Sequence, residues 1–245
     1  MKKVALILHG WPDYNVKFHF LTEDLEKNRY EVITPNLFNF EDDFKLEESV
    51  KRIKEKLDGR IPNLNIGISF EGFVLPAVAK KYPNSKLIFI AAGPFFKPDS
   101  GIFGFFLKIS KYKISVLFCE GLLKLPNTLI KFVYLSTYLF RGDSSALEIY
   151  KKDMDRNLGY IKKIPVKKDI EVLKFVNSID NSKLLKNLKN QSLIFSSKND
   201  HYIPLYLGKA LHKLLKNSEL IIKDGEHFNV FEESDLKTVD EFLKK

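Results

Sequence analysis

Ser69 occupies a position that suits a nucleophile, because an apolar run, Leu64–Ile68, ends just before it and a helical pattern begins just after it in the sequence GISFEG. A serine hydroxyl is a weak nucleophile at neutral pH, so it must be held close to a base and presented away from the backbone. A tight turn between a strand and a helix does this when the residues around the serine are small. Gly67 meets that requirement, whereas Glu71 stands two residues after the serine and Gly72 comes one place late.

Ser69 could instead cap the following helix, because serine is a preferred N-cap residue. A capping box would place Glu or Gln three residues later, and Gly72 stands there. The short motif by itself therefore leaves catalysis and capping open.

An acid and a histidine follow the serine in the order that a Ser-His-Asp triad requires on a parallel sheet. Asp200 comes after the apolar run SLIFSS, and His227 comes after ELIIKDGE. If both runs are strands, their carboxyl ends lie at the same edge of the sheet as Ser69. Asp200 could also begin a turn, and His227 could have no function, but the coincidence of all three positions favours the triad. Asp99 is the alternative acid, and His201 is expected to be an exposed neighbour.

The N-terminal segment LILHGWPDY offers groups that could bind an anion. A strand that ends at His9–Gly10 is followed by a turn, and the amide of Trp11 can point from it toward Ser69. Together with the amide of Phe70 it would supply the two donors of an oxyanion hole. A turn selected only for packing is the alternative.

Short apolar runs that alternate with helical patterns must position these residues. Strands are predicted at Val4–Leu8, Glu31–Thr34, Leu64–Ile68, Leu87–Ala91, Ser192–Ser196 and Glu219–Ile222. Helices are predicted at Lys17–Asn28, Phe44–Leu57, Glu71–Tyr82, Ile170–Leu188, Leu205–Leu215 and Leu236–Leu243. This alternation predicts an α/β fold, with a mostly parallel, doubly wound sheet covered on both faces.

Residues 95–165 interrupt the alternation, because they are rich in Phe and Leu and contain no clear strand. We therefore expect a core made of residues 1–94 and 166–245, with a helical lid or cap inserted between them. Phe95, Phe96 and Glu71 are candidates for the lining of a substrate pocket, and the aromatic residues favour an apolar ligand. The same aromatic residues could instead form the insertion's own core.

The composition further limits the classes of function that the chain could have. The chain of 245 residues is long enough for one well-buried core. Its net charge of +9 comes mainly from lysine pairs separated by acids, with only five arginines, which favours a solvated surface over a nucleic-acid site. The single cysteine excludes an internal disulfide and indicates a reducing, cytoplasmic location. No apolar run is long enough to span a membrane, and Val4–Leu8 is too short for a secretory signal.

The motifs HGWP, GISFEG, SSKNDHYIP and GEHF, in this order and on these strands, resemble those of the α/β-hydrolase superfamily over essentially the whole chain. The resemblance implies that Ser69 is the nucleophile, His227 the general base and then acid, and Asp200 its orienting partner. It also implies that the amides of Trp11 and Phe70 form the oxyanion hole, and that neither a metal nor a cofactor is needed.

The HGWP motif is similar to epoxide hydrolases as well, but those place Asp where this chain has Ser69. Glu71 departs from the family pattern, and it could change the turn, select the substrate or mark a member that has lost activity.

The expected function is therefore a carboxylesterase acting on small to medium apolar acyl esters. A peptidase or a thioesterase would use the same triad, and in an aminopeptidase Glu71 could bind the substrate's ammonium group. A catalytically inactive ligand-binding protein is the alternative of a different class. The sequence leaves open the natural substrate and the oligomeric state, monomer or homodimer.

Overall fold

The computed structural model divides the chain into two compact units, Met1–Lys97 with Ile179–Lys245, and Pro98–Ser178. Its described residues are 2–11, 19–37, 44–97, 108–112, 114–132, 158–159, 162, 165–200 and 202–245. The second unit extends beyond the insertion expected at 95–165, because it also contains the helix α8 (Val166–Ser178).

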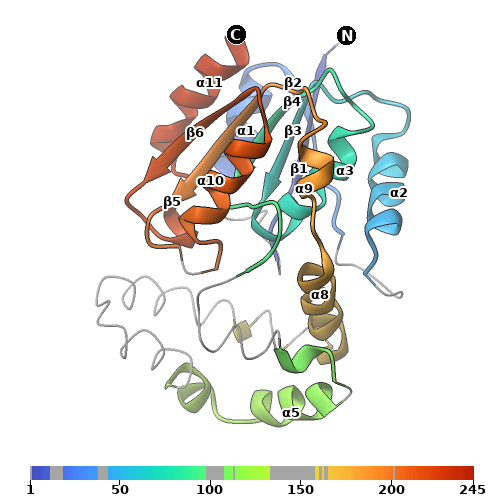
Figure 1. Ribbon diagram of the computed structural model, residues 1–245, viewed down its shortest axis with the longest axis vertical. Helices are drawn as coiled ribbons and strands as arrows, with labels where there is room; N and C mark the ends of the chain where they lie inside the picture. The colour runs from blue at the N-terminus through green and yellow to red at the C-terminus, as the bar shows by residue number, and fades with distance from the viewer. Residues whose placement is uncertain are drawn as a thin grey trace. The chain divides into compact units, whose positions relative to one another are not determined.

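The first unit is built on one sheet of six strands in the order β2-β1-β3-β4-β5-β6, as Figure 1 shows. The strands are β1 (Lys3–Leu8), β2 (Tyr30–Ile33), β3 (Leu64–Ile68), β4 (Lys86–Ile90), β5 (Ser192–Ser197) and β6 (Ser218–Lys223). Every neighbouring pair is parallel. The predicted parallel sheet is thus confirmed, and each predicted strand is found with its bounds shifted by no more than one residue.

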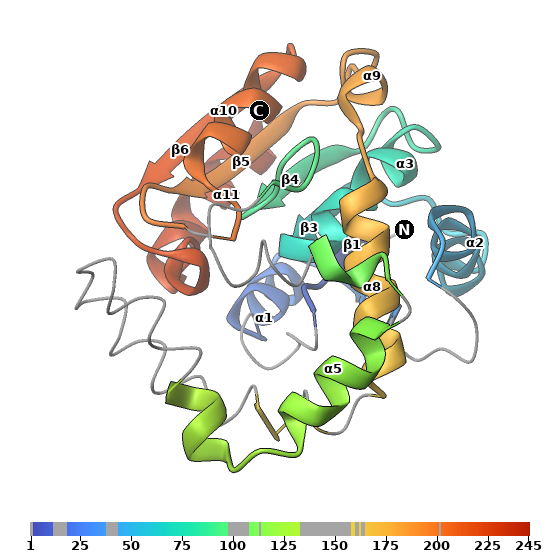
Figure 2. The same cartoon turned by 60° about the horizontal axis from the view of Figure 1, so that its bottom comes forward.

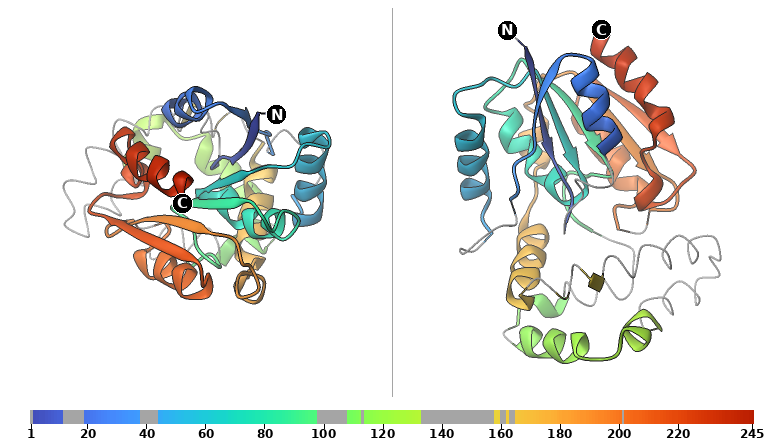
Figure 3. Two further views of the ribbon diagram at one scale, coloured as in Figure 1. Left: turned by 90° about the horizontal axis from the view of Figure 1, so that it is seen from above. Right: turned by 180° about the vertical axis from the view of Figure 1, so that it is seen from behind.

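Helices cover both faces of this sheet, as predicted (Figure 3). On one face lie α1 (His19–Lys27) and α11 (Leu236–Lys244), whose buried side chains join alternate strand residues in one apolar cluster. On the other face lie α2 (Leu46–Leu57), α3 (Leu75–Ala79), α9 (Ser182–Leu185) and α10 (Leu205–Leu214). The strands β1, β3, β4 and β5 are buried at nearly every position and largely apolar, whereas β6 at the edge of the sheet is partly exposed.

Two predicted helices differ from the structure. The predicted helix Glu71–Tyr82 is a 3-10 turn, η1 (Ser69–Phe73), followed by the short helix α3. The predicted helix Ile170–Leu188 is divided into α8 and α9. Between them Asp180 forms an isolated antiparallel bridge with Phe95, and the amide of Asn181 donates to the carbonyl of Pro94 over 2.8 Å. These contacts join the two ends of the core from which the second unit extends.

The described part of the second unit is helical. Its α5 (Ile114–Leu123) contacts α8. Six of its apolar or aromatic side chains are exposed: Tyr112, Ile114, Leu117, Phe118, Leu129 and Phe132. In the part of the chain that the structure describes, none of the helices has the length and apolar character needed to cross a membrane.

Candidate active site

The turn between β3 and η1 holds Ser69 in a left-handed backbone conformation, with φ of 49°. This conformation is unfavourable for a residue with a Cβ atom, and such strain occurs at functional sites. Gly67 and Gly72 make room for the turn. A Cβ on Gly67 would lie 2.8 Å from Leu75 Cδ2, and one on Gly72 would lie 2.6 Å from Ala92 Cβ. The late glycine of the motif is therefore a steric requirement of the turn.

The hydroxyl of Ser69 forms no helix cap. Ile68 is the N-cap residue of η1, and that cap has no side-chain hydrogen bond. Instead, Ser69 Oγ lies 2.9 Å from His227 Nε2, although 158 residues separate the two in the chain. The capping alternative is thereby removed.

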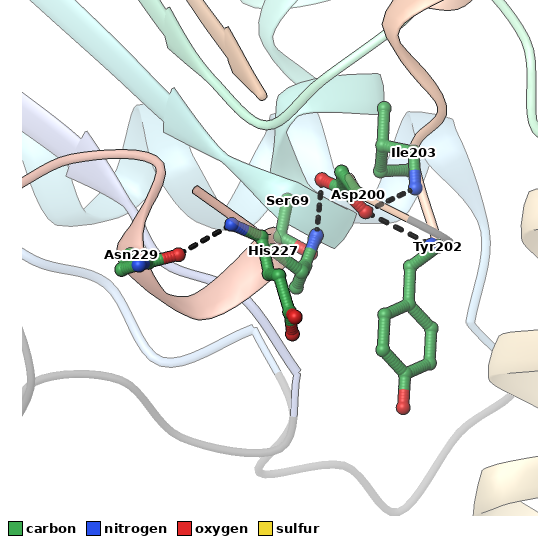
Figure 4. Close-up of polar contacts among 7 residues, drawn as sticks. Ser69, Asp200, Tyr202, Ile203, His227 and Asn229 are labelled. Atoms are coloured by element: carbon green, nitrogen blue, oxygen red, sulfur yellow. Dashed lines mark hydrogen bonds and ion pairs between the residues drawn. The ribbon is translucent and has the colours of Figure 1, made fainter. Parts of the chain in front are cut away.

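His227 also contacts Asp200, whose Oδ2 lies 2.7 Å from His227 Nδ1 (Figure 4). Both side chains are buried. Asp200 follows β5, His227 follows β6 and Ser69 follows β3, so all three lie at the carboxyl ends of the strands, which Figure 2 turns toward the viewer. The three residues selected from the sequence are thus brought together as a continuous chain of hydrogen bonds.

The second oxygen of Asp200 organises its own loop. Asp200 Oδ1 accepts hydrogen bonds from the backbone amides of Tyr202 at 2.9 Å and Ile203 at 2.8 Å (Figure 4). The turn-forming role that the sequence offered as an alternative is therefore present together with the histidine contact. Each role uses a different oxygen, so the two are compatible.

The loop that carries His227 depends on two residues that the sequence analysis did not select. Asn229 Oδ1 accepts a hydrogen bond from the amide of Glu226 in a capping box around the 3-10 turn η2 (His227–Asn229). The ring of Tyr202 lies 5.1 Å from the His227 ring, centroid to centroid. The only sequence signal was the Asn three residues after Glu226.

The candidate oxyanion segment lies beside the elbow. In the sheet register Leu8 pairs with Gly67, so the residues that follow β1 run alongside the turn at Ser69. This position, between β1 and β3, is the point where the strand order reverses, and open α/β sheets bind ligands there. Trp11 is partly exposed, and Phe70 packs edge-on against Phe44 with ring centroids 5.2 Å apart.

The remaining candidates from the sequence are Phe95, Phe96, Asp99 and His201. The ring of Phe96 packs edge-on against Phe73 of η1, with centroids 5.8 Å apart, and Phe95 is partly buried at its bridge. Asp99 and His201 lie outside the described residues. No group of three or more His, Cys, Asp or Glu side chains that could hold a metal ion occurs in the described ranges.

Glu71 is completely buried. Burial raises the pKa of its carboxyl group well above the usual value, and the backbone of His9 opposes this shift more weakly. A buried acid that favours its neutral form is poorly suited to bind a substrate's ammonium group, which argues against the aminopeptidase alternative.

No family model matches the sequence, and no curated protein matches it either. Among solved structures, a bromoperoxidase from Bacillus anthracis is 18% identical, with a TM-score of 0.74 over 100% of this chain and 93% of that one. The α/β-hydrolase enzyme MGS-M2 from a Medee basin deep-sea metagenome library is 18% identical, with a TM-score of 0.72 over 100% and 90%.

An esterase from Exiguobacterium antarcticum is 15% identical, with a TM-score of 0.69 over 99% of this chain and 92% of that one. These similarities cover nearly the full length of both chains. The sheet order and the position of the elbow, together with these similarities, identify the architecture: the chain has the α/β-hydrolase fold.

Proposed function

We propose that this protein is a serine hydrolase of the carboxylesterase type. The observation that carries the proposal is the chain of hydrogen bonds from Ser69 through His227 to Asp200. Such an arrangement activates a hydroxyl group, because the imidazole can accept the hydroxyl proton while the carboxylate stabilises the resulting imidazolium. The strained backbone of Ser69 supports the same role.

In the acylation step, Ser69 Oγ attacks the carbonyl carbon of the ester and its proton passes to His227 Nε2. Asp200 fixes the tautomer of the imidazole by accepting a hydrogen bond from Nδ1–H. The carbonyl oxygen becomes an oxyanion, which accepts hydrogen bonds from the amides of Phe70 and Trp11. When the tetrahedral intermediate collapses, the C–O bond to the alcohol breaks, and the alcohol leaves with the proton from Nε2.

Deacylation repeats the sequence with water as the nucleophile. His227 Nε2 takes a proton from water as the water oxygen attacks the acyl carbon, and the second intermediate expels Ser69, whose oxygen recovers its proton. The products are a carboxylic acid and the free enzyme, so no electron acceptor is consumed.

We assign small to medium apolar acyl esters as the substrate class. Support comes from the aromatic residues Phe95 and Phe96, which follow β4 near the point where the second unit begins. Residues 95–165, the insertion expected from the sequence, are proposed as the lid, and the aromatic residues of that segment suit apolar acyl groups.

Labelling with a fluorophosphonate tests the proposal, together with hydrolysis of p-nitrophenyl esters of increasing acyl length. Wild type should be labelled, and Ser69→Ala and His227→Ala should lose both labelling and at least about 10³-fold in kcat/KM. Ser234→Ala and His212→Ala, at exposed positions, are the matched controls and should behave as wild type. A folded wild type that is neither labelled nor active would refute the proposal and favour a ligand-binding protein.

A further inference from the structure

Glu71 is the buried acid that the proposed mechanism does not use. It stands two residues after Ser69, where the turn would accept a glycine, and none of its surface is exposed. Neither carboxylate oxygen has a hydrogen-bond partner of normal geometry among the described residues. An ionised carboxylate in such a position is costly, because burial removes its water and nothing replaces it.

No charged group of the packed elements balances this acid. η1 packs against β3, β4 and α3, of which β3 and α3 contain no titratable side chain. The lysines of β4 and β1, Lys86 and Lys3, stand at the amino ends of their strands, at the opposite edge of the sheet. Three residues outside η1, namely Phe44, Phe96 and Asn181, contact Phe70 or Phe73 of η1. The charged residues next to them in the chain are exposed: Lys45, Lys97 and Asp180.

The titratable groups at the same edge as Glu71 include His9, Asp200, His227 and the buried Glu226, which directly precedes His227. Asp200 and His227 are hydrogen-bonded to each other. His9 is buried, and its backbone is the polar group whose effect on the Glu71 carboxyl is resolved. The carboxyl of Glu71 therefore lies near the backbone of His9, two residues before Trp11.

We propose that Glu71 is a positioning residue: its neutral carboxyl group packs behind the His9–Gly10–Trp11 segment and keeps the oxyanion hole competent, whereas its ionisation inactivates the site. The inference rests on the proposed esterase function. A negative charge behind the two amides would oppose the oxyanion that forms in the transition state, in a poorly solvated environment where charges interact strongly.

The expected consequence is a loss of kcat/KM at high pH, because Glu71 ionises there. The direction follows from the raised pKa of Glu71. Above that pKa, kcat/KM should fall by about tenfold per pH unit, as for any single essential ionisation.

Glu71→Gln tests this directly, because glutamine keeps the size of the side chain and cannot ionise. The variant should lose the fall in kcat/KM at high pH. Glu233→Gln, which changes an exposed carboxyl group, is the matched control and should keep this fall. A high-pH limb that persists unchanged in Glu71→Gln would overturn the inference.

Unfolding by urea as a function of pH gives a readout that does not need catalysis. Because the folded pKa is raised, the folded protein holds a proton that the unfolded chain releases at about pH 4.3. Wild-type stability should therefore fall as pH rises from that value through the folded pKa, and Glu71→Gln should lack this part of the slope. If the slope difference is found but wild type is not labelled at Ser69, the esterase proposal fails while the neutral state of Glu71 stands.

A third measurement uses wild type alone, in case Glu71→Gln does not fold. Carboxyl ¹³C spectra of protein labelled in glutamate, recorded across a pH titration, should show a glutamate carboxyl group that stays protonated at a pH where ordinary glutamates are ionised. A spectrum in which every glutamate is ionised at that pH would overturn the inference.

Discussion

Asp200 offers the sharpest test of the proposed mechanism, because its two oxygens perform separate tasks. Oδ2 accepts from His227 Nδ1 at 2.7 Å, and Oδ1 accepts from the amides of Tyr202 and Ile203. Replacement by asparagine can preserve the second task, because the amide oxygen can take the place of Oδ1. It destroys the first, since an NH₂ group then faces His227 and favours the wrong tautomer.

The two tasks predict different magnitudes. For Asp200→Asn we expect kcat/KM to fall by about 10⁴-fold, or about 5 kcal/mol of transition-state stabilisation, with a loss of unfolding free energy of only about 1 kcal/mol. Asp200→Ala should lose similar activity. Its free energy of unfolding should also be lower by a further about 1–3 kcal/mol, because the amide of the buried Ile203 is left without its acceptor.

The assay is steady-state hydrolysis of a p-nitrophenyl ester combined with urea unfolding of the same preparations. Asp224→Asn is the control, because Asp224 is an exposed aspartate that pairs with Lys198. If Asp200→Asn retains activity within tenfold of wild type, Asp200 is not the orienting acid, and the same substitution at Asp99 becomes the next test. Equal stability of the Asn and Ala variants would refute the role assigned to Oδ1.

Three further predictions concern Gly72, Asn229 and Asp169. Gly72→Ala should destabilise the protein by about 1–3 kcal/mol and lower kcat/KM, because the new Cβ would lie 2.6 Å from Ala92 Cβ; urea unfolding and ester hydrolysis check this. Asn229→Ala should lower kcat/KM by about tenfold or more with little change in KM, because the loop that positions His227 loses its cap; unchanged kinetics would contradict that role. Burial raises the pKa of Asp169 to about 8. The free energy of unfolding should therefore fall, by at most about 5 kcal/mol, as pH rises from about 4 to about 8, and urea unfolding of Asp169→Asn should lack this fall.

The periodicity of the sequence was sufficient for the sheet and for the order of the site residues. Strands buried on both faces are rich in apolar residues, so β1, β3, β4 and β5 stood out as apolar runs, and turn residues marked their ends. The chain order of Ser69, Asp200 and His227, each placed after a strand, then predicted that the three lie at one edge. That inference needed no distances, because parallel strands share the direction of their carboxyl ends.

The bounds of the helices were harder to predict from the sequence. The helical pattern of residues 170–188 was continuous, yet the chain is divided there by the contacts of Asp180 and Asn181 with residues 94 and 95. These partners are more than eighty positions away in the sequence. Local propensity carries no information about such contacts, so sequence reasoning predicted one helix where the structure has two.

Tertiary structure alone decided the roles of particular atoms. The short motif around Ser69 allowed a cap or a nucleophile, and the order of Ser69, Asp200 and His227 favoured the triad. The distances assign the Ser69 hydroxyl to His227 and give each Asp200 oxygen its own partners. Glu71 was read as a possible pocket residue, whereas the fold encloses it completely. The sequence determines which groups are present and in what order. Burial and hydrogen-bond pairing depend on segments that meet only in the folded protein, and these two properties determine the charge and chemistry of each group.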